Sequence, residues 1–367
     1  MLKGRIKALK QLFRIAQLLH KIAPFYSLKY WSDFLRTVHL CREERFSPDE
    51  VFEFGLFKSG LTRSELSKFS SRKKLTKVQE SLNPVSWTPV LRNKGIFYRY
   101  CMALGVPIPK LYAIFFRKTA GWAYNGSPLT TRDDWKSFFD TQLPSRFVIK
   151  PASATCGYGV NIFSRVGQTF VDTSGSSLKP EQIYDILLSD PRYDSFVIQQ
   201  RLQSHPELMH LGGTEFLQTV RFITFVDTDN NSRILHANWK PIVGPNIVDN
   251  WQNGQIGNLI ATISLDSGLL KPAVKSSLNG QGIKTIPAHP QTGFSFDGFQ
   301  MPLWQQACGL VKETAPKFLP VRTIAWDVAI TPDATYIVEG NIWWDPPNQQ
   351  RRMGVILGAL MDNNKCL

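Results

Sequence analysis

The chain of 367 residues has little that would place it in or across a membrane. No stretch approaches the ~18 consecutive apolar residues of a membrane-spanning helix. The N-terminus lacks the apolar segment and the small-residue cleavage site of a secretory signal. Internal repeats and low-complexity segments are also absent. These absences predict a cytoplasmic globular protein, long enough for two or three packed units.

Cysteine is scarce and unpatterned. The five cysteines are odd in number, widely scattered and in no CxxC or Cys/His spacing. This excludes the spacing typical of a disulfide framework or a zinc site, and we expect reduced thiols. The residues are Cys41, Cys101, Cys156, Cys308 and Cys366.

Acidic residues are outnumbered, with 29 Asp and Glu against 43 Lys and Arg and a formal net charge of +14. Residues 1–78 carry 17 Lys and Arg against 7 Asp and Glu, so most of the excess lies there. A basic arm can bind nucleic acid, anionic lipid or an acidic partner. No nucleic-acid-binding motif accompanies this charge, so nucleic acid is not an expected partner.

Residues 1–21 predict a basic amphipathic helix, because apolar residues recur every three to four positions among Lys and Arg. Such a helix can lie on a membrane surface, or it can pack its apolar stripe on the rest of the protein. Further helices are expected near residues 30–41 and from Ser47, with Pro48 at the first helical position. The run 70–77 is typical of a surface connection. The apolar stripe of the first helix, over residues 1–21, comprises Leu2, Ile6, Leu9, Phe13 and Ala16.

Beyond residue 80 short apolar runs alternate with turn residues, which indicates strands. A helix is expected over 301–318. We predict an α+β fold with mainly antiparallel sheets behind a helical N-terminal region. The expected units are residues 1–80, 81–196 and 197–367. The expected strands are 111–116, 147–150, 159–163, 196–198, 220–226, 234–243 and 259–265.

The strongest chemical signal is a predicted hairpin of residues 326–330 and 336–341, joined by turn residues 331–335. Asp327 lies on one strand, while Glu339 and Asn341 project from one face of the other because side chains alternate along a strand. Two carboxylates and an amide oxygen suit Mg²⁺. The alternative is a set of buried polar residues that bond to one another at the end of a sheet.

Cations precede this hairpin in a regular order. Lys150 ends a strand and is followed by a loop of small residues, whose backbone N–H groups can approach phosphate oxygens. Lys94, after Asn93, is a second candidate phosphate ligand, while Arg221 and Lys240 occupy the two strands of one hairpin. An ordinary turn, a solvated lysine and pairing with acids are the competing explanations. The loop residues of interest are Ser153, Thr155, Gly157 and Gly159.

The order of these segments resembles the ATP-grasp superfamily, which includes D-alanine:D-alanine ligase and the ribosomal-protein glutamate ligases. The resemblance runs from about Asn83 to Pro347. It is closest to the sugar-transfer-associated ATP-grasp proteins found in bacterial polysaccharide gene clusters. The residues that carry it are QQRLQSHPEL (199–208), DNWQNG (249–254), His289-Pro290, WDVAI (326–330) and VEGN (338–341).

The resemblance implies a role for each matching position. Lys94 and Lys150 would contact the α- and β-phosphates of ATP, beneath a lid of residues 153–159. Arg221 and Lys240 would stabilise the γ-phosphate and an acyl-phosphate. The superfamily's two Mg²⁺ ions would bind Asp327, Glu339 and Asn341.

The nucleoside would bind further along the chain. Gln199 and Leu202 would meet adenine through their backbones, and a backbone contact would survive the departure at Gln200, where an acid is common. Glu207 would hold the ribose hydroxyls, although His205 is close enough to compete. A second departure is Ala325, where some ligases of the superfamily carry an arginine.

The implied activity is an ATP- and Mg²⁺-dependent carboxylate–amine ligase that forms an amide through an acyl-phosphate, in polysaccharide or related metabolite biosynthesis. Its partners would be a small-molecule or saccharide carboxylate and an amine. A phosphotransferase and a non-catalytic scaffold on a membrane or partner remain alternatives. The candidate substrate loop holds Asp249, Asn250, Trp251 and Asn253. Three tryptophans lie near this loop in the sequence and either pack on a sugar face or belong to the core. They are Trp239, Trp343 and Trp344.

Overall fold

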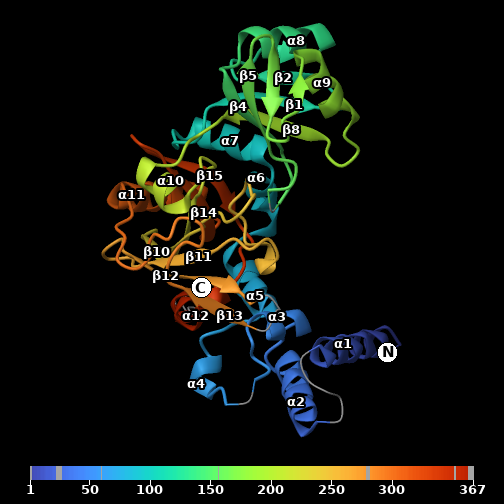
Figure 1. Cartoon of the computed structure of the whole chain (residues 1–367), viewed down its shortest axis with the longest axis vertical. Helices are drawn as coiled ribbons and strands as arrows, with labels where there is room; N and C mark the ends of the chain where they lie inside the picture. The colour runs from blue at the N-terminus through green and yellow to red at the C-terminus, as the bar shows by residue number, and fades with distance from the viewer. Residues whose placement is uncertain are drawn as a thin grey trace.

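A computed structural model of the chain describes residues 2–21, 27–58, 60–155, 157–277, 282–350 and 353–362. Three parts follow one another along the long axis of the molecule (Figure 1). The N-terminal helices lie at one end, a first sheet lies at the other, and a second sheet lies between them. In the described ranges, no helix combines the length and the apolar character that crossing a membrane requires.

The N-terminal helices pack around a core of their own. Ile15 and Leu19 are fully buried there with Val51, because the apolar residues of each helix recur on one face. Helix α3 begins as predicted, with Ser47 and Glu50 forming a capping box and Pro48 at its first position. The helices are α1 (Leu2–His20), α2 (Leu28–Arg42), α3 (Pro48–Glu53) and α4 (Arg63–Leu66).

The surface connection expected at residues 70–77 is wrong, because helix α5 (Arg72–Leu82) occupies this run. The Ser71 side chain caps the helix by accepting a hydrogen bond from the Lys74 backbone N–H at 3.2 Å. Leu75 and Leu82 face the second sheet. Lys73 and Lys77 are exposed, while Arg72 pairs with Asp345, so positive charge in this run did not rule out a helix whose apolar face packs on the protein.

The first sheet has eight strands in the order β3-β2-β1-β8-β4-β5-β6-β7, all paired antiparallel. Aromatic residues of helices α8 and α9 join its strands in one core. Helix α7 packs with β1 and β8 in another. The strands are Leu111–Phe116, Gly121–Ala123, Pro128–Leu129, Arg146–Pro151, Asn161–Val166, Thr169–Asp172, Ser177–Leu178 and Ser195–Gln200. The helices here are η1 (Val85–Trp87), α6 (Thr88–Arg92), α7 (Lys94–Ala103), α8 (Arg132–Thr141) and α9 (Pro180–Ser189).

The second sheet has seven strands in the order β13-β12-β11-β10-β9-β14-β15, also antiparallel. Helix α11 packs on one side, and α5 and α12 pack on residues of the other side. The strands are β9 (Val220–Val226), β10 (Ser232–Trp239), β11 (Ile260–Ile263), β12 (Leu270–Ser276), β13 (Ile283–Ile286), β14 (Thr323–Ile330) and β15 (Thr335–Asn341). The helices are α10 (Pro206–Gly212), η2 (Gln252–Gly254), α11 (Trp304–Thr314), η3 (Ala315–Phe318), η4 (Asn348–Gln350) and α12 (Met353–Asp362).

The predicted α+β architecture with antiparallel sheets is confirmed, but both expected boundaries fall inside regular elements. Residue 80 lies within α5, and residue 196 lies within β8. Among the cysteines, Cys41, Cys101 and Cys308 are free thiols. Cys156 and Cys366 fall outside the described residues.

Candidate active site

A cavity of about 620 Å³ is lined by residues of both sheets and of the N-terminal helices. Strand β4 contributes Lys150, β9 contributes Arg221, and β14 and β15 contribute Asp327 and Glu339. The sequence segments that carry the candidate chemistry therefore meet in one place, although Lys94 and Glu339, for example, are 245 residues apart.

One end of the cavity holds two lysines on separate elements. Asn93 caps helix α7 by accepting hydrogen bonds from the N–H groups of Gly95 and Ile96, which places Lys94 at the helix N-terminus. The Lys94 Nζ atom donates to the Ala154 carbonyl at 2.8 Å and lies 3.2 Å from Glu339 Oε1. A lysine at the positive end of a helix is well placed to bind an anion.

Lys150 is the second lysine, and it is 6% exposed. Its Nζ atom donates to the Tyr98 hydroxyl at 2.9 Å, and that hydroxyl donates to the Val338 carbonyl at 2.8 Å. Burial, with repulsion from Lys94, lowers the pKa of Lys150 to about 7. No motif in the sequence identified Tyr98, yet it follows Lys94 by four residues, a spacing that places both on one helix face.

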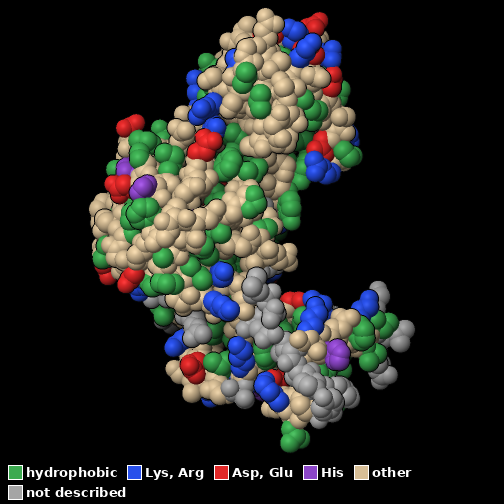
Figure 2. All heavy atoms as spheres, in the orientation of Figure 1, with side chains coloured by type: hydrophobic (Ala, Val, Ile, Leu, Met, Phe, Trp, Pro, Cys, Tyr) green, Lys and Arg blue, Asp and Glu red, His purple; other side chains and the backbone are tan. Residues whose placement is uncertain are grey.

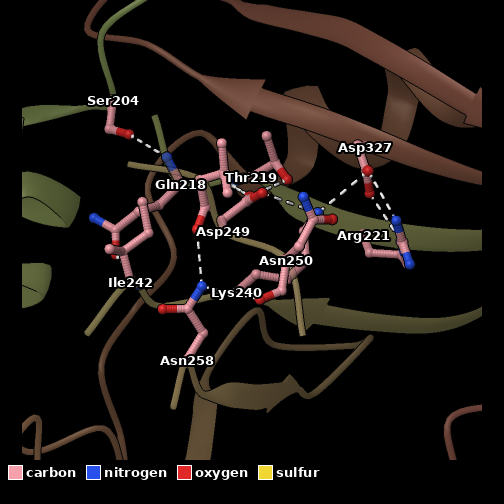
Figure 3. Close-up of polar contacts among 11 residues, drawn as sticks. Ser204, Gln218, Thr219, Arg221, Lys240, Ile242, Asp249, Asn250, Asn258 and Asp327 are labelled. Carbon is pink, nitrogen blue, oxygen red and sulfur yellow. Dashed lines mark hydrogen bonds and ion pairs between the residues drawn. The ribbon is translucent and has the colours of Figure 1, made fainter. Parts of the chain in front are cut away.

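Asp327 forms ion pairs with Arg221 and Lys240 in the cavity (Figure 3). Its Oδ1 and Oδ2 atoms accept from Arg221 Nε at 2.8 Å and from the Arg221 terminal nitrogen at 2.9 Å. Lys240, directly after β10, lies 3.2 Å from Asp327 Oδ2. Burial alone would raise the pKa of Asp327, but the two cations outweigh it and hold that pKa below its usual range.

Lys240 also links this centre to the substrate loop, since its Nζ atom lies 3.4 Å from Asp249 Oδ1. Asp249 Oδ2 in turn accepts from the Thr219 N–H at 2.7 Å and from its hydroxyl at 2.6 Å. Asn258 donates to the carbonyls of Val248 and Asn250, which fixes the loop backbone. Figure 3 shows Lys240 beside both acids. No sequence signal identified Thr219.

The three predicted metal ligands lie together at the cavity wall. Asp327 and Glu339 are cross-strand partners on β14 and β15, and Asn341 follows two residues later. Across the described ranges no cluster of three or more His, Cys, Asp or Glu side chains forms, so any metal here would have two carboxylates and an amide. Asn341 Nδ2 is buried without a hydrogen-bond partner, so this N–H group is free to donate to a ligand oxygen such as that of a phosphate, while a metal would bind the amide oxygen.

The small-residue loop after Lys150 reaches across to the substrate loop. Gly157 has φ +70°, and a Cβ atom there would lie 2.7 Å from Asn250 Nδ2 and 3.1 Å from Val248 Cβ. Only glycine suits both this backbone conformation and this approach. The loop therefore lies against the substrate loop at Gly157, and its role as a lid over the lysines stays a prediction.

The remaining predicted residues divide into two groups. Thr155, Gln199, Gln200 and Leu202 line the cavity, and Gln199 Oε1 is buried without a partner. The lining excludes Ser153, Gly159 and Glu207, of which Ser153 accepts from Asn93 and Glu207 is exposed beside His205. The side chain of Asn253 lies outside the described part of the chain.

The far end of the cavity comes from residues that the sequence analysis did not select. Glu50, Glu53 and Phe54 of the N-terminal helices line it with Arg72 and Asp345. Glu53 Oε1 accepts from the Trp251 indole N–H at 3.2 Å. Burial raises the pKa of Glu53, although this hydrogen bond and Arg72 act against the rise.

The tryptophans near the substrate loop do not share one role. Trp239, the last residue of β10, is fully buried in the core, where its ring lies against Phe296. Trp251, Trp343 and Trp344 line the cavity instead. The indole N–H of Trp344 is buried without a partner.

Residues 73–349 match the sequence profile of the sugar-transfer associated ATP-grasp family. The chain belongs to this family. A search of curated proteins gave no match. The matched range contains every predicted phosphate, metal and substrate residue, but it leaves out Glu50, Glu53 and Phe54 at the far end of the cavity.

Solved structures are similar to this ATP-grasp chain at low identity. An L-amino acid ligase from Bacillus licheniformis is 10% identical with a TM-score of 0.38, over 72% of this chain and 42% of that one. A D-alanine–D-alanine ligase from Bacillus anthracis is 12% identical with a TM-score of 0.38, over 75% of this chain and 68% of that one. A biotin carboxylase from Campylobacter jejuni is 8% identical with a TM-score of 0.43, over 75% of this chain and 46% of that one.

ATP-grasp proteins in general bind ATP with Mg²⁺, and the residues of this cavity fit both. Lys94 and Lys150 offer cations at one end, beside the unpartnered amide oxygen of Gln199. Asp327, Glu339 and Asn341 would hold Mg²⁺, since hard oxygen ligands from few side chains leave room for phosphate and water.

Proposed function

We propose that this ATP-grasp protein is an ATP- and Mg²⁺-dependent ligase that joins a carboxylate to an amine through an acyl-phosphate. The observation that carries the proposal is the position of Lys240, which lies between the candidate metal ligand Asp327 and the substrate-loop residue Asp249. A cation in this place can neutralise a phosphoryl group as it passes from nucleotide to substrate.

The chain's own residues contribute mainly position and charge. Lys94 and Lys150 would hold the phosphates of ATP, and Arg221 with Lys240 would stabilise the group in transfer. Mg²⁺, when bound, would neutralise charge on the phosphate oxygens. Asp327 holds both Arg221 and Lys240 in place before the reaction, which lowers the cost of bringing these cations to the transferred group.

Water must be kept away from an acyl-phosphate, because hydrolysis would waste the nucleotide. The loop that contains Gly157 approaches Val248 and Asn250 closely, and we expect it to cover the transfer site when nucleotide is bound. The amine would then displace phosphate, forming the C–N bond as the acyl C–O bond breaks.

The test is a nucleotide product assay with panels of sugar acids, amino acids and amines. We expect ADP and phosphate release only when a carboxylate and an amine are both present, with an amide of matching mass. Lys240→Met should reduce this release by at least about 100-fold, as the loss of one charge-stabilising group does in other enzymes. AMP formation would overturn the proposal, and a stable phosphorylated product without an amide would indicate a phosphotransferase.

The far end of the cavity differs in charge from the end that holds Lys94 and Lys150. Glu50, Glu53 and Asp345 outnumber Arg72 there, whereas the other end carries the phosphate-binding lysines. The guanidinium of Arg72 is already paired, because its Nε atom lies 2.5 Å from Asp345 Oδ1. We infer that an anionic nucleotide and an amine-bearing substrate enter opposite ends.

Trp251→Phe tests this assignment, because it keeps an aromatic ring and removes the hydrogen bond to Glu53. We expect the KM for the amine to rise by about three- to tenfold, the effect of one hydrogen bond of about 1 kcal/mol, with the KM for ATP unchanged. Steady-state kinetics measures both values.

Trp304→Phe is the matched control, since its indole N–H makes a bond of the same 3.2 Å length to the Leu265 carbonyl, and Trp304 does not line the cavity. We expect this control to leave both KM values unchanged. A rise in the KM for ATP in Trp251→Phe alone would contradict the assignment of the two ends.

A further inference from the structure

Helix α1 has two apolar faces, and only one of them is covered. Ile15 and Leu19 are 0% exposed in the core of the N-terminal helices. Ile6, Leu9 and Phe13 are 46%, 66% and 65% exposed. Their spacing places them on one stripe, which is the stripe found in the sequence. Ile6, Leu9 and Phe13 are therefore open to solvent, whereas Ala16 of the same stripe is half-buried.

Helix α2 repeats this arrangement beside α1. Tyr30 and Leu40 are each 2% exposed in the same core, whereas Leu28, Trp31 and Leu35 are 91%, 45% and 67% exposed. Figure 2 shows hydrophobic side chains gathered on this end of the molecule beside Lys and Arg. Isolated apolar side chains are common on protein surfaces, but two adjoining helices with exposed stripes indicate an interaction surface.

The charge around these stripes selects the partner. No Asp or Glu precedes Asp33, while Lys and Arg occupy seven of the first 32 positions. Lys10 and Lys21 are exposed on and beside α1. Arg14 pairs with Asp49 and Lys29 pairs with Asp33, but basic residues still outnumber acids around the stripes. A stripe of Leu, Ile and Phe with mainly basic flanks is typical of helices that lie in the headgroup region of an anionic bilayer. Trp31 is a residue type that favours this interface.

We propose that α1 and α2 bind the surface of an anionic lipid bilayer through the exposed stripe Ile6, Leu9 and Phe13 and its neighbours on α2. Ile15 and Leu19 anchor α1 to the body of the protein, so the catalytic cavity would be held at the membrane. This surface lies outside residues 73–349 and does not depend on the ligase reaction.

The test is sedimentation of the full chain with vesicles of phosphatidylglycerol and phosphatidylcholine, and with phosphatidylcholine alone. We expect binding to the anionic vesicles, weakened by added salt, and little binding to the neutral ones. Leu9→Ser with Phe13→Ser should weaken binding by at least about tenfold, because each apolar side chain then leaves the bilayer. The double variant should keep its affinity for Mg·ATP, since both side chains are exposed.

Val85→Ser with Val355→Ser is the matched control, because these side chains are 66% and 70% exposed outside α1 and α2. We expect this control to bind vesicles as the wild type does. Equal binding by both double variants, or no binding by the wild type, would overturn the proposal. A dimer that forms without vesicles and is lost in Leu9→Ser with Phe13→Ser would identify a second copy as the partner instead.

Discussion

Asp327→Asn should abolish activity and also destabilise the fold. Arg221 and Lys240 share this carboxylate, and Lys240 is only 6% exposed. An amide of the same shape would leave both cations without their full negative partner in a buried place. Loss of one partner from a buried ion pair costs about 3–5 kcal/mol, so the urea midpoint should fall clearly. Activity should fall by at least about 100-fold.

Glu339→Gln separates the two consequences. Its side chain is 29% exposed, and its partner Lys94 keeps a second bond to the Ala154 carbonyl. Because partly exposed pairs contribute little, the free energy of unfolding should change by less than about 1 kcal/mol. Activity should nevertheless fall, and half-maximal activity should need more Mg²⁺. Full activity in Asp327→Asn would contradict the role of this site in phosphoryl transfer.

Some features of this site follow from local sequence patterns, and others do not. The hairpin of β14 and β15 was predictable, because alternating apolar residues and an intervening turn are local signals. This placed Asp327, Glu339 and Asn341 correctly on facing strands. The pairing of Arg221 with Asp327 joins residues 106 apart, and no local pattern carries that information.

Helix α5 and the contact between Glu53 and Trp251 were not predicted, because both depend on packing between segments far apart in the sequence. Residues 70–77 have so much positive charge that a surface connection was expected, although Leu75, Val78 and Leu82 recur at helical spacing. The contact between Glu53 and Trp251 spans 198 residues and forms only because α3 packs at the end of the cavity. Resemblance to a family could not predict it either, since α3 lies outside the matched residues.

Lys150→Met should change nucleotide affinity and stability in opposite directions. Burial lowers the pKa of Lys150 from 10.5 to about 7, so folding at neutral pH desolvates a partly charged amine. Methionine has a similar length and no charge, and Tyr98 keeps its bond to the Val338 carbonyl. We expect the free energy of unfolding at pH 7 to rise by on the order of 2 kcal/mol. Mg·ATP affinity should fall by at least about tenfold.

The pH dependence of the free energy of unfolding tests whether the lowered pKa of Lys150 causes this gain in stability. Between pH 7 and 10.5 the unfolded chain keeps the Lys150 proton that the folded chain releases, so this group makes wild-type stability rise with pH. The stability advantage of Lys150→Met should therefore shrink from pH 7 to pH 9 in urea unfolding. Nucleotide phosphates favour the charged lysine, so wild-type binding should take up a proton and weaken over the same range.

Lys94→Met is the matched control, since Lys94 is equally buried, at 7% exposed against 6%, but pairs with Glu339. It should lose nucleotide affinity without gaining stability, because its removal leaves an acid without its partner. Calorimetry at pH 8 in buffers of different ionisation enthalpy measures the proton uptake, which Lys150→Met should lack and Lys94→Met should retain. If Lys94→Met loses it and Lys150→Met retains it, Lys150 is not the group that takes up the proton.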